Sequence, residues 1–295
     1  QSNAMKLYVN GNLEANATMT GLNTGATALR LGASLNADAF LNGALDDVRI
    51  YNRGLSLAEI RELSGFYPAH VANLGIWYDA SRIGDTGNPN PAEGSDVSLW
   101  NDLSLNNRFA DKSGASSSKP KFRTNVINGL PTVRFTEADG QRMDINNFGR
   151  NLNTTQHTQL VAFRASGGLP GAITSQSSGH NIFLYNAGPV LQSQIGGTYR
   201  SANTAYVDNT FVIAGLSYAN PAGTFYRNGV ADGTFSATAQ SSTNAWRFGD
   251  ASSALNGDVA ELIIYDRVLT AAELEKVNCY YNKKYAIAVT GVVCE

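Results

Sequence analysis

The sequence is poor in charge. Only 16% of its 295 residues are charged, with Lys+Arg 22 against Asp+Glu 24, which gives a formal net charge of -2. Soluble globular proteins carry about 25% charged residues. This balance excludes a nucleic-acid binder, because such a protein needs a basic surface to neutralise phosphates. No apolar run reaches the roughly 20 residues of a membrane-spanning helix, so we expect no membrane span.

Cysteine is almost absent. Cys279 and Cys294 are the two cysteines, and no further cysteine or histidine stands at ligand spacing, which excludes a structural zinc site. Two interpretations are open. The thiols are unrelated and free, or they form a disulfide that ties the C-terminal tail to the preceding helix and implies an oxidising compartment. We predict the disulfide, which closes a loop of about 15 residues.

Polarity comes from small uncharged residues instead. The chain has 30 Asn and 29 Gly, and both residue types tolerate the positive φ angles of tight turns. A hydrophobic share of 43% is sufficient for a packed core. The mixture is typical of many short strands joined by turns.

An internal half-repeat is the strongest signal in the chain. Three blocks recur in the same order, and the longest one aligns without a gap. The matched blocks are 8–11 with 226–229, 29–32 with 246–249, and 41–63 with 255–277.

Each repeated block predicts a local structure. An Asn-Gly pair after an aromatic residue predicts β-hairpins at residues 8–13 and 225–231. Residues 44–51 alternate between apolar and polar with period two, which predicts a strand. The matching residues 259–265 are more uniformly apolar and predict a strand that is covered on both faces. A short helix follows each strand. Its start is marked by capping-box spacing, Ser56 with Glu59 and Thr270 with Glu273.

The repeat also sets the expected domain organisation. Residues 1–4 are interpreted as the remnant of a cleavable tag, and no signal-peptide pattern follows them. Residues 5–64 are interpreted as the C-terminal half of a domain, 65–70 as a linker and 71–295 as a complete domain. So small a half-domain buries little apolar surface and leaves strand edges unpaired. We therefore expect residues 5–64 to pack on the complete domain, or to self-associate by pairing with another chain.

Short strands with turn signals between them fill the complete domain. The predicted strands are 74–78, 97–100, 132–135, 159–164, 172–175, 182–185, 190–194 and 210–218. Together with a C-terminal helix, this pattern predicts an all-β fold, an antiparallel two-sheet jelly-roll sandwich with short C-terminal helices.

The motifs resemble those of laminin-G-like jelly-roll domains of the concanavalin A-like lectin/glucanase superfamily. The repeated blocks resemble the family's C-terminal half. The further matching segments are 76–81 (IWYDAS), 97–104 (VSLWNDLS), 128–135 (NGLPTVRF) and 280–285 (YYNKKY). The resemblance implies a bacterial member with tandem domains, of which the first is truncated. It points to a fold and not to one function, since the superfamily includes lectins, glycosidases, adhesion modules and spacers.

No pattern of catalytic residues stands out. The glucanase branch places two or three carboxylates in alternation along one strand, so that acid and nucleophile share a face. Nothing here matches that spacing. The acids of the repeat strand are interpreted as solvated rim charges or turn acids; they are Asp46, Asp47, Asp258 and Glu261. The three histidines lie far apart, and there is no nucleophile elbow or phosphate loop. We expect no enzymatic activity.

Calcium is the one metal that the resemblance suggests, because relatives often hold this ion at the rim of the sandwich. Oxygen-only ligands suit it. A loop of the complete domain offers five such groups; the candidate ligands are Asp85, Asn88, Asn90, Glu93 and Asp96. The alternative is an ordinary polar loop.

Sugar binding normally uses an exposed aromatic platform. Trp77, Trp100 and Trp246 fall in apolar positions and are predicted to be core residues. A platform could instead be formed by tyrosines of the concave face; the candidates are Tyr185, Tyr199, Tyr206 and Tyr218. Packing in the core or at a sheet edge is the alternative for these four.

Taken together, the sequence predicts a non-catalytic binding or adhesion module of a larger secreted bacterial protein. Its expected partner is a glycan or an extracellular protein surface. A structural spacer domain without a ligand of its own is the alternative, and a glycan-processing enzyme is the third hypothesis. The expected location is extracellular or at the cell surface.

Overall fold

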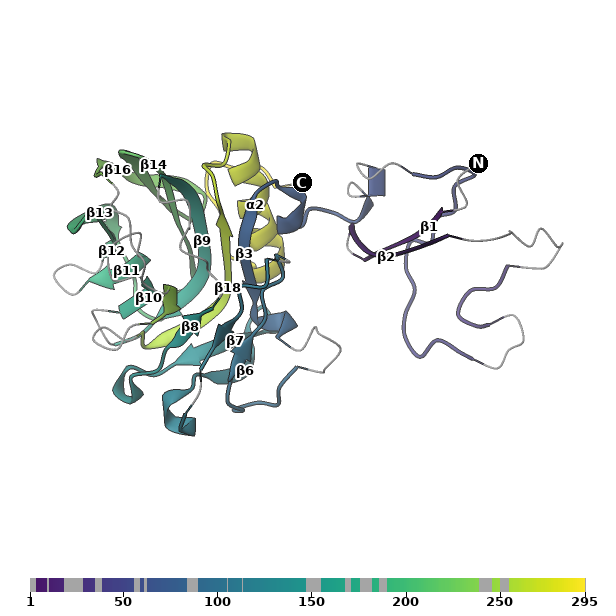
Figure 1. Cartoon of the computed structure of the whole chain (residues 1–295), viewed down its shortest axis with the longest axis horizontal. Helices are drawn as coiled ribbons and strands as arrows, with labels where there is room; N and C mark the ends of the chain where they lie inside the picture. Colours follow the sequence, from purple (N-terminus) through teal and green to yellow (C-terminus); the bar gives the residue numbers. More distant parts are fainter. Residues whose placement is uncertain are drawn as a thin grey trace. The chain divides into compact units, whose positions relative to one another are not determined.

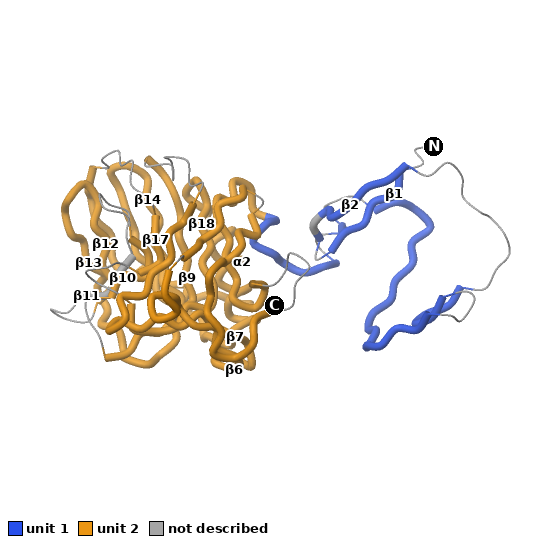
Figure 2. The backbone as a smooth tube through the Cα atoms, turned by 60° about the horizontal axis from the view of Figure 1, so that its bottom comes forward, with its two compact units in different colours: residues 1–70 blue, residues 71–295 orange. Residues whose placement is uncertain are grey.

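The chain divides into two compact units, residues 1–70 and 71–295 (Figure 2). A computed structural model of the chain describes the following residues: 4–9, 11–18, 29–34, 39–55, 59–60, 63–83, 90–104, 106–112, 114–146, 155–167, 171–175, 182–185, 190–238, 246–249 and 255–294.

Unit 71–295 is a sandwich of two antiparallel sheets (Figure 1). Its first half contributes β3 (Leu74–Asp79), β4 (Leu99–Trp100), β5 (Ala110–Asp111), β6 (Lys121–Ile127), β7 (Leu130–Phe135), β8 (Met143–Ile145), β9 (Gln156–Ala165) and β10 (Gly171–Ser175). Its second half contributes β11 (Ile182–Tyr185), β12 (Val190–Ile195), β13 (Thr198–Ala205), β14 (Val212–Ala219), β15 (Ala222–Arg227), β16 (Val230–Ser236), β17 (Trp246–Phe248), β18 (Gly257–Tyr265) and helix α2 (Ala271–Tyr285). Its short 3-10 turns are η2 (Ala80–Arg82), η3 (Ser116–Ser118) and η4 (Glu137–Asp139), while η1 (Pro68–His70) belongs to unit 1–70.

One sheet, which we name the β18 sheet, has the order β16-β15-β14-β9-β18-β7-β6. β18 pairs with β9 along one edge, while its other edge is shared between β7 at residues 257–259 and β3 at residues 261–265. The second sheet, which we name the β17 sheet, has the order β13-β12-β11-β10-β17-β8-β5-β4. This confirms the predicted jelly-roll fold class.

The core fills the space between the two sheets. Trp100 stacks on Phe248 with ring centroids 5.1 Å apart, and Tyr78 packs against both rings. Trp77, Trp100 and Trp246 are all at most 1% exposed, so the prediction that the tryptophans are core residues is confirmed. Trp100 and Trp246 lie between the two sheets, whereas Trp77 is buried on the other face of the β18 sheet, where it donates to Glu261. Burying each of these large rings removes 150–250 Å² of mostly apolar surface from water, which makes them main contributors to the stability of the unit.

Several strands were not predicted from the sequence. These are β5, β6, β8, β13, β16 beyond its first residues, and β17, while the predicted strand at 97–100 is reduced to Leu99–Trp100. Three of the missed strands have two or three residues each. Such segments have too little alternation to be recognised in a sequence, and they exist because neighbouring strands pair with them.

Helix α2 covers the face of the β18 sheet that points away from the core, near β3 (Figure 1). Thr270 and Glu273 form the predicted capping box: the Thr270 hydroxyl accepts from the amide of Glu273, and the Glu273 carboxylate accepts from the amide of Thr270. A bidentate ion pair with Arg267 also holds Glu273, at 2.6 and 2.8 Å. The hydrogen bond from Arg267 is the main cause that lowers the pKa of Glu273 to about 2.

A buried polar network anchors α2 to the sheet. The Glu261 carboxylate of β18 accepts hydrogen bonds from Trp77 Nε1 (2.5 Å), Tyr280 OH (2.9 Å), Tyr285 OH (2.8 Å) and Lys284 Nζ (2.9 Å). Lys284 Nζ also donates to Asp79, at the end of β3. Both carboxylates are at most 2% exposed. Burial raises the pKa of Glu261, and the positive charge of Lys284 opposes that rise.

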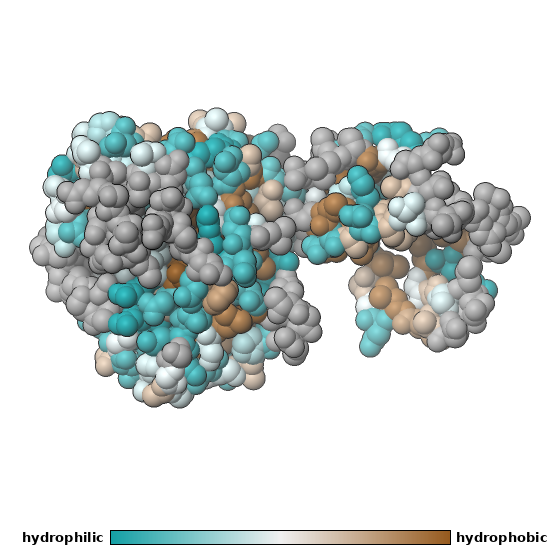
Figure 3. All heavy atoms as spheres, in the orientation of Figure 1, coloured by the Kyte–Doolittle hydropathy of each residue, from teal (hydrophilic) through white to brown (hydrophobic). Residues whose placement is uncertain are grey.

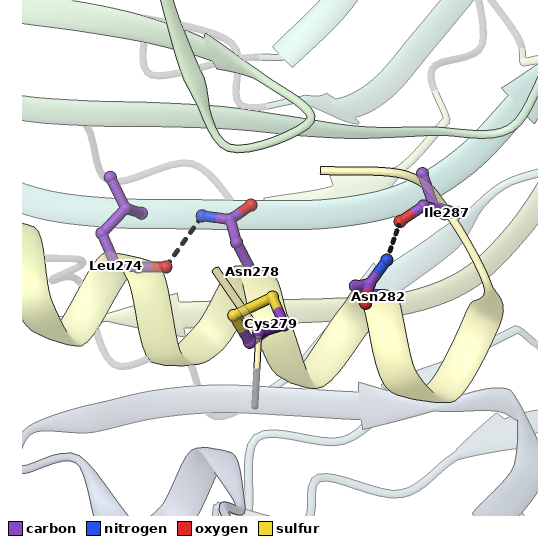
Figure 4. Close-up of a disulfide and its surroundings, with 6 residues drawn as sticks. Leu274, Asn278, Cys279, Asn282 and Ile287 are labelled. Carbon is purple, nitrogen blue, oxygen red and sulfur yellow. Dashed lines mark hydrogen bonds between the residues drawn. A yellow bond between two sulfur atoms is a disulfide. The ribbon is translucent and has the colours of Figure 1, made fainter. Parts of the chain in front are cut away.

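The disulfide between Cys279 and Cys294 is present, with the two Cα atoms 5.2 Å apart (Figure 4). It joins the middle of α2 to the end of the chain. The intervening tail runs past the β15–β16 turn, where the amide of Thr290 donates to the carbonyl of Asn228 at 3.0 Å. The tail therefore covers the turn of that hairpin, as well as being tied to the helix as predicted.

Unit 1–70 contains the predicted N-terminal hairpin, β1 (Ala4–Val9) with β2 (Asn12–Thr18). Apolar residues are exposed over much of this unit (Figure 3). The more than 40% exposed side chains include Met5, Leu7, Leu29, Leu31, Phe40, Leu45, Val48, Ile50 and Tyr51. That residues 5–64 are not stable alone stays a prediction.

The predicted strand at 44–51 is wrong. This segment is irregular, and Ile50 is 72% exposed, whereas its repeat counterpart Ile264 in β18 is fully buried. The reason is pairing. The three neighbours of β18 all come from residues 74–165, and the described part of unit 1–70 offers no corresponding strands.

No helix within the described residues combines the length and the apolar character required to cross a membrane.

Candidate functional site

The outward face of the β17 sheet carries a line of polar side chains across three neighbouring strands, β17, β8 and β5. Strand pleating puts alternate residues on opposite faces. Ala110, Ile145 and Trp246 point into the core, so their neighbours Asp111, Asp144 and Arg247 point outward. Asp144 is the register partner of both others, Asp111 on β5 and Arg247 on β17.

Asn146 completes this group, which we call the polar row: Asp111, Asp144, Asn146 and Arg247. Arg247 Nε donates to Asp144 Oδ1 at 2.7 Å, and Asn146 Nδ2 donates to Asp111 Oδ1. The side chains of Asp144 and Arg247 are both 34% exposed. The row thus presents two carboxylates, a guanidinium and a carboxamide to solvent in fixed positions.

Such planar groups suit the hydroxyls of a sugar. A carboxylate accepts hydrogen bonds, a guanidinium donates them, and a carboxamide does both. Because each member of the row is held by a neighbour on the same sheet, little side-chain freedom is lost when a ligand binds. Three of its four members sit on strands, which hold side chains more precisely than loops do, and Asn146 directly follows β8.

Sequence reasoning missed the polar row. Its two aspartates are 33 positions apart, and only the pairing of β5 with β8 brings them together. The search for carboxylates alternating along one strand could not find a pair that lies across two strands.

The acids of the repeat strand are not solvated rim charges, as the sequence had suggested for β18. Asp258 and Glu261 are 1% and 0% exposed. Glu261 belongs to the network under α2, and Asp258 is bound by Arg134 and Arg164. Helix α2 covers Glu261, and two guanidinium groups enclose the Asp258 carboxylate, so these acids are structural partners. In unit 1–70, Asp47 is exposed and pairs with Arg49.

The predicted calcium ligands do not converge within the described residues. Glu93 accepts from the amide of Thr124 at 2.6 Å, and Asp96 accepts from Lys121 and Ser116. These hydrogen bonds lower the pKa of both carboxylates.

Asn90, the third described member, donates through Nδ2 to the carbonyl of Ser81 at 2.7 Å. Asp85 and Asn88 lie outside the described residues. In the part of the chain that is described, no cluster of three His, Cys, Asp or Glu side chains could hold a metal. The three described members of the loop are each bound to a different partner, and calcium binding stays a prediction for this loop.

Two of the four tyrosines predicted to form a platform are buried. Tyr206 and Tyr218 are 5% and 0% exposed. Their hydroxyls bind backbone carbonyls of Thr210 and Ala237, so both residues belong to the core. Tyr206 follows β13, and Tyr218 lies in β14. The inward positions of these strands are apolar, so an aromatic ring at such a position is buried, whichever group its hydroxyl binds.

Tyr199 is different. It is 55% exposed on the edge strand β13 and is the register partner of Gln194, which alternates with the buried residues of β12. It therefore lies on the outward face of the β17 sheet, the same face as the polar row. Four strand spacings of about 4.8 Å separate β17 from β13. The side chain of Tyr185 lies outside the described residues.

Unit 71–295 is therefore a two-layer antiparallel jelly roll with polar side chains across one outward face. The profile of the family described as the concanavalin A-like lectin/glucanases superfamily matches residues 1–61 and 150–275. The chain belongs to this superfamily. The two matched segments cover the two copies of the internal repeat except for the last two residues of each copy.

Solved structures share this fold at low identity. The binding domain of Paraclostridial Mosquitocidal Protein 1 is 14% identical with a TM-score of 0.52, over 73% of this chain and 53% of that one. A Trypanosoma rangeli sialidase in complex with 2,3-difluorosialic acid is 12% identical with a TM-score of 0.46, over 73% of this chain and 34% of that one.

Domain 4 of an extracellular arabinanase from Geobacillus stearothermophilus, in complex with arabinotriose, is 14% identical with a TM-score of 0.45, over 68% of this chain and 96% of that one. The chain spans about half or less of the first two structures. No curated protein matches the sequence. At these identities the likeness concerns the fold alone.

Proposed function

We propose that unit 71–295 is a non-catalytic carbohydrate-binding module of an extracellular protein, and that it binds glycan on the outward face of the β17 sheet. The polar row is the observation that carries this proposal. Membership of a superfamily that includes lectins supports it, and so does Tyr199 on the same face. The disulfide supports an extracellular location, because such bonds persist in oxidising compartments.

The proposal predicts that Asp144→Asn weakens glycan binding. Asparagine keeps the shape of the side chain but loses the charge, and a hydrogen bond to a charged group contributes about 1.5–3 kcal/mol, or roughly 10–100-fold in affinity. A glycan array identifies a ligand, and calorimetry compares the variant with the parent chain. Glu275→Gln, which removes an exposed carboxylate from α2, is the matched control and should bind normally. An array without any hit would favour the spacer alternative.

The same ligand tests the non-catalytic part of the proposal. The two carboxylates of the polar row accept hydrogen bonds from Asn146 and Arg247, an arrangement that orients hydroxyl groups. We expect no release of reducing sugar from a bound polysaccharide. Release that disappears in Asp144→Asn would instead make the unit a glycosidase.

Calcium binding by the loop of residues 85–96 remains part of the proposal. An ion that binds only the folded state raises the melting temperature by mass action. The unit should therefore melt at a lower temperature in a chelator and recover with added calcium. An identical melting temperature under both conditions would remove calcium from the proposal.

A further inference from the structure

A second polar cluster lies on the other sheet, where three central strands end. Asp258 of β18 is the register partner of Arg134 on β7 and of Arg164 on β9. The three side chains form one line across the sheet. A cavity of about 240 Å³ opens beside them; it is lined by Arg134, Phe135, Arg164, Ser166, Asn209, Asn256, Gly257 and Asp258.

The hydrogen bonds of Asp258 fix both guanidinium groups. Arg134 donates through Nε and Nη2, each at 2.9 Å, and Arg164 donates through Nε at 2.8 Å. Thr132 Oγ1 donates a fourth bond at 2.9 Å. The carboxylate oxygens are therefore fully used. The guanidinium of Arg164 also lies over the ring of Phe211, 5.0 Å from its centroid.

Both arginines have N–H donors that Asp258 does not use. Arg164 uses its Nε–H on Asp258, so the two Nη groups at the end of its guanidinium still carry N–H donors, and Arg134 keeps those of Nη1. Within the described residues these donors have no further partner. The side chain of Arg134 is 34% exposed and that of Arg164 is 28% exposed. Two positive charges against one negative charge leave the cluster with a net charge of +1.

This arrangement matches a carboxylate. The end of a guanidinium presents two parallel N–H groups, which bind the two oxygens of a carboxylate in a bidentate pair. The cavity is smaller than the 300–1,000 Å³ of drug-sized ligand sites, so it suits a single sugar unit of a glycan. Asn209 and Asn256 add carboxamide groups to its wall for neighbouring hydroxyls.

Gly257 keeps the cavity floor close-packed. A Cβ atom at this position would lie 2.1 Å from the carbonyl oxygen of Arg164. Only glycine allows β18 to lie this close to the end of β9, and this approach holds Arg164 beside Asp258.

We propose that this cavity, on the opposite face of the sandwich from the polar row, is a second glycan site of the module and binds the carboxylate of an acidic sugar residue, a uronic acid. The inference rests on the proposed carbohydrate-binding function and adds a ligand class to it. Arg164 and Arg134 hold the carboxylate, while Asp258 positions both guanidinium groups without touching the ligand.

Calorimetry on the full chain tests this, with oligogalacturonate and oligoglucuronate as probes and their methyl esters as matched uncharged controls. We expect at least one acid to bind about tenfold or more tightly than its ester. Arg164→Gln should reduce the affinity for that acid to the level of the ester and leave the ester unchanged. Arg164→Lys keeps the positive charge but lacks the two parallel N–H groups of the guanidinium. It should restore part of the difference in affinity between the acid and its ester.

Arg200→Gln is the control, because it removes an exposed arginine whose guanidinium binds the carbonyl of Ser236, away from the cavity. It should leave the affinities unchanged. Circular dichroism and melting curves establish that every variant is folded. The proposal is wrong if each acid binds no more tightly than its ester, or if folded Arg164→Gln binds the acid like the parent chain.

The two proposals fail in different ways. Binding of acid and ester with equal affinity, lost in Asp144→Asn, would keep the carbohydrate-binding function and overturn the uronate pocket. An absence of binding to these probes and to a glycan array would overturn both.

Discussion

Lys284→Met is expected to destabilise unit 71–295 by about 3–5 kcal/mol, the usual result of removing one partner from a buried ion pair. Lys284 Nζ is the one charged donor shared by Glu261 and Asp79 among the described residues. Without it, two buried carboxylates remain close together and cannot return to water. For a unit of this size each kcal/mol lowers the melting temperature by about 2–4 °C, so the expected loss is roughly 6–20 °C.

The loss of stability in Lys284→Met should depend on pH. Burial raises the pKa of Glu261 in the folded chain. A raised pKa means that this group favours folding at low pH, and that the contribution is lost as pH rises through the folded value. Removal of Lys284 raises that pKa further. The difference between Lys284→Met and the parent chain should therefore be largest near neutral pH and shrink in acid.

Lys283→Met is the matched control. Lys283 is the preceding residue of α2 and is exposed, so its replacement should change stability by no more than about 0.5 kcal/mol. The double variant Glu261→Gln with Lys284→Met should recover part of the loss, because it leaves fewer uncompensated charges. Equal stability of Lys284→Met and Lys283→Met in denaturant unfolding would contradict the anchoring role of the network.

Cys294→Ser is expected to cost about 3 kcal/mol, from the entropy of closing a loop of about 15 residues in the unfolded chain. This corresponds to a melting temperature roughly 6–12 °C lower. Loss of the disulfide also frees the tail that covers the β15–β16 turn, where the Thr290 amide donates to the Asn228 carbonyl. Differential scanning calorimetry of the parent chain and the variant measures both quantities.

Two comparisons isolate the disulfide. Cys279→Ser with Cys294→Ser should melt like the single variant, and a reductant should lower the melting temperature of the parent chain alone. Labelling of two free thiols in unreduced, denatured protein would show that the bond is not formed and would remove the expected effect.

The internal repeat separates local from tertiary effects within one chain. Both copies form the predicted hairpin, β1 with β2 and β15 with β16. The glycine that ends the second block has a positive φ in both, 74° at Gly32 and 71° at Gly249. Arg53 pairs with Glu59 at 2.6 and 3.0 Å, as Arg267 pairs with Glu273. These features involve residues close in sequence, and the sequence was sufficient to place the hairpins and the α2 cap.

The long block behaves differently. Residues 44–51 and β18 have related sequences, yet one is irregular and exposed, and the other is buried between three strands. A strand obtains its hydrogen bonds from other strands, so an alternating pattern is not sufficient where partners are absent. The same dependence on partners explains why β5, β8 and β17 were not predicted.

For this protein, the amino-acid sequence by itself determined the jelly-roll class, the repeat, the core tryptophans and the cysteine pair, because these follow from turn chemistry, periodicity and composition. The polar row and the arginine pocket were decided by tertiary structure alone. Asp111 meets Asp144, and Asp258 meets Arg134 and Arg164, only through strand register. Register is set by how two whole sheets pack, and a shift of one residue would turn each of these side chains to the opposite face.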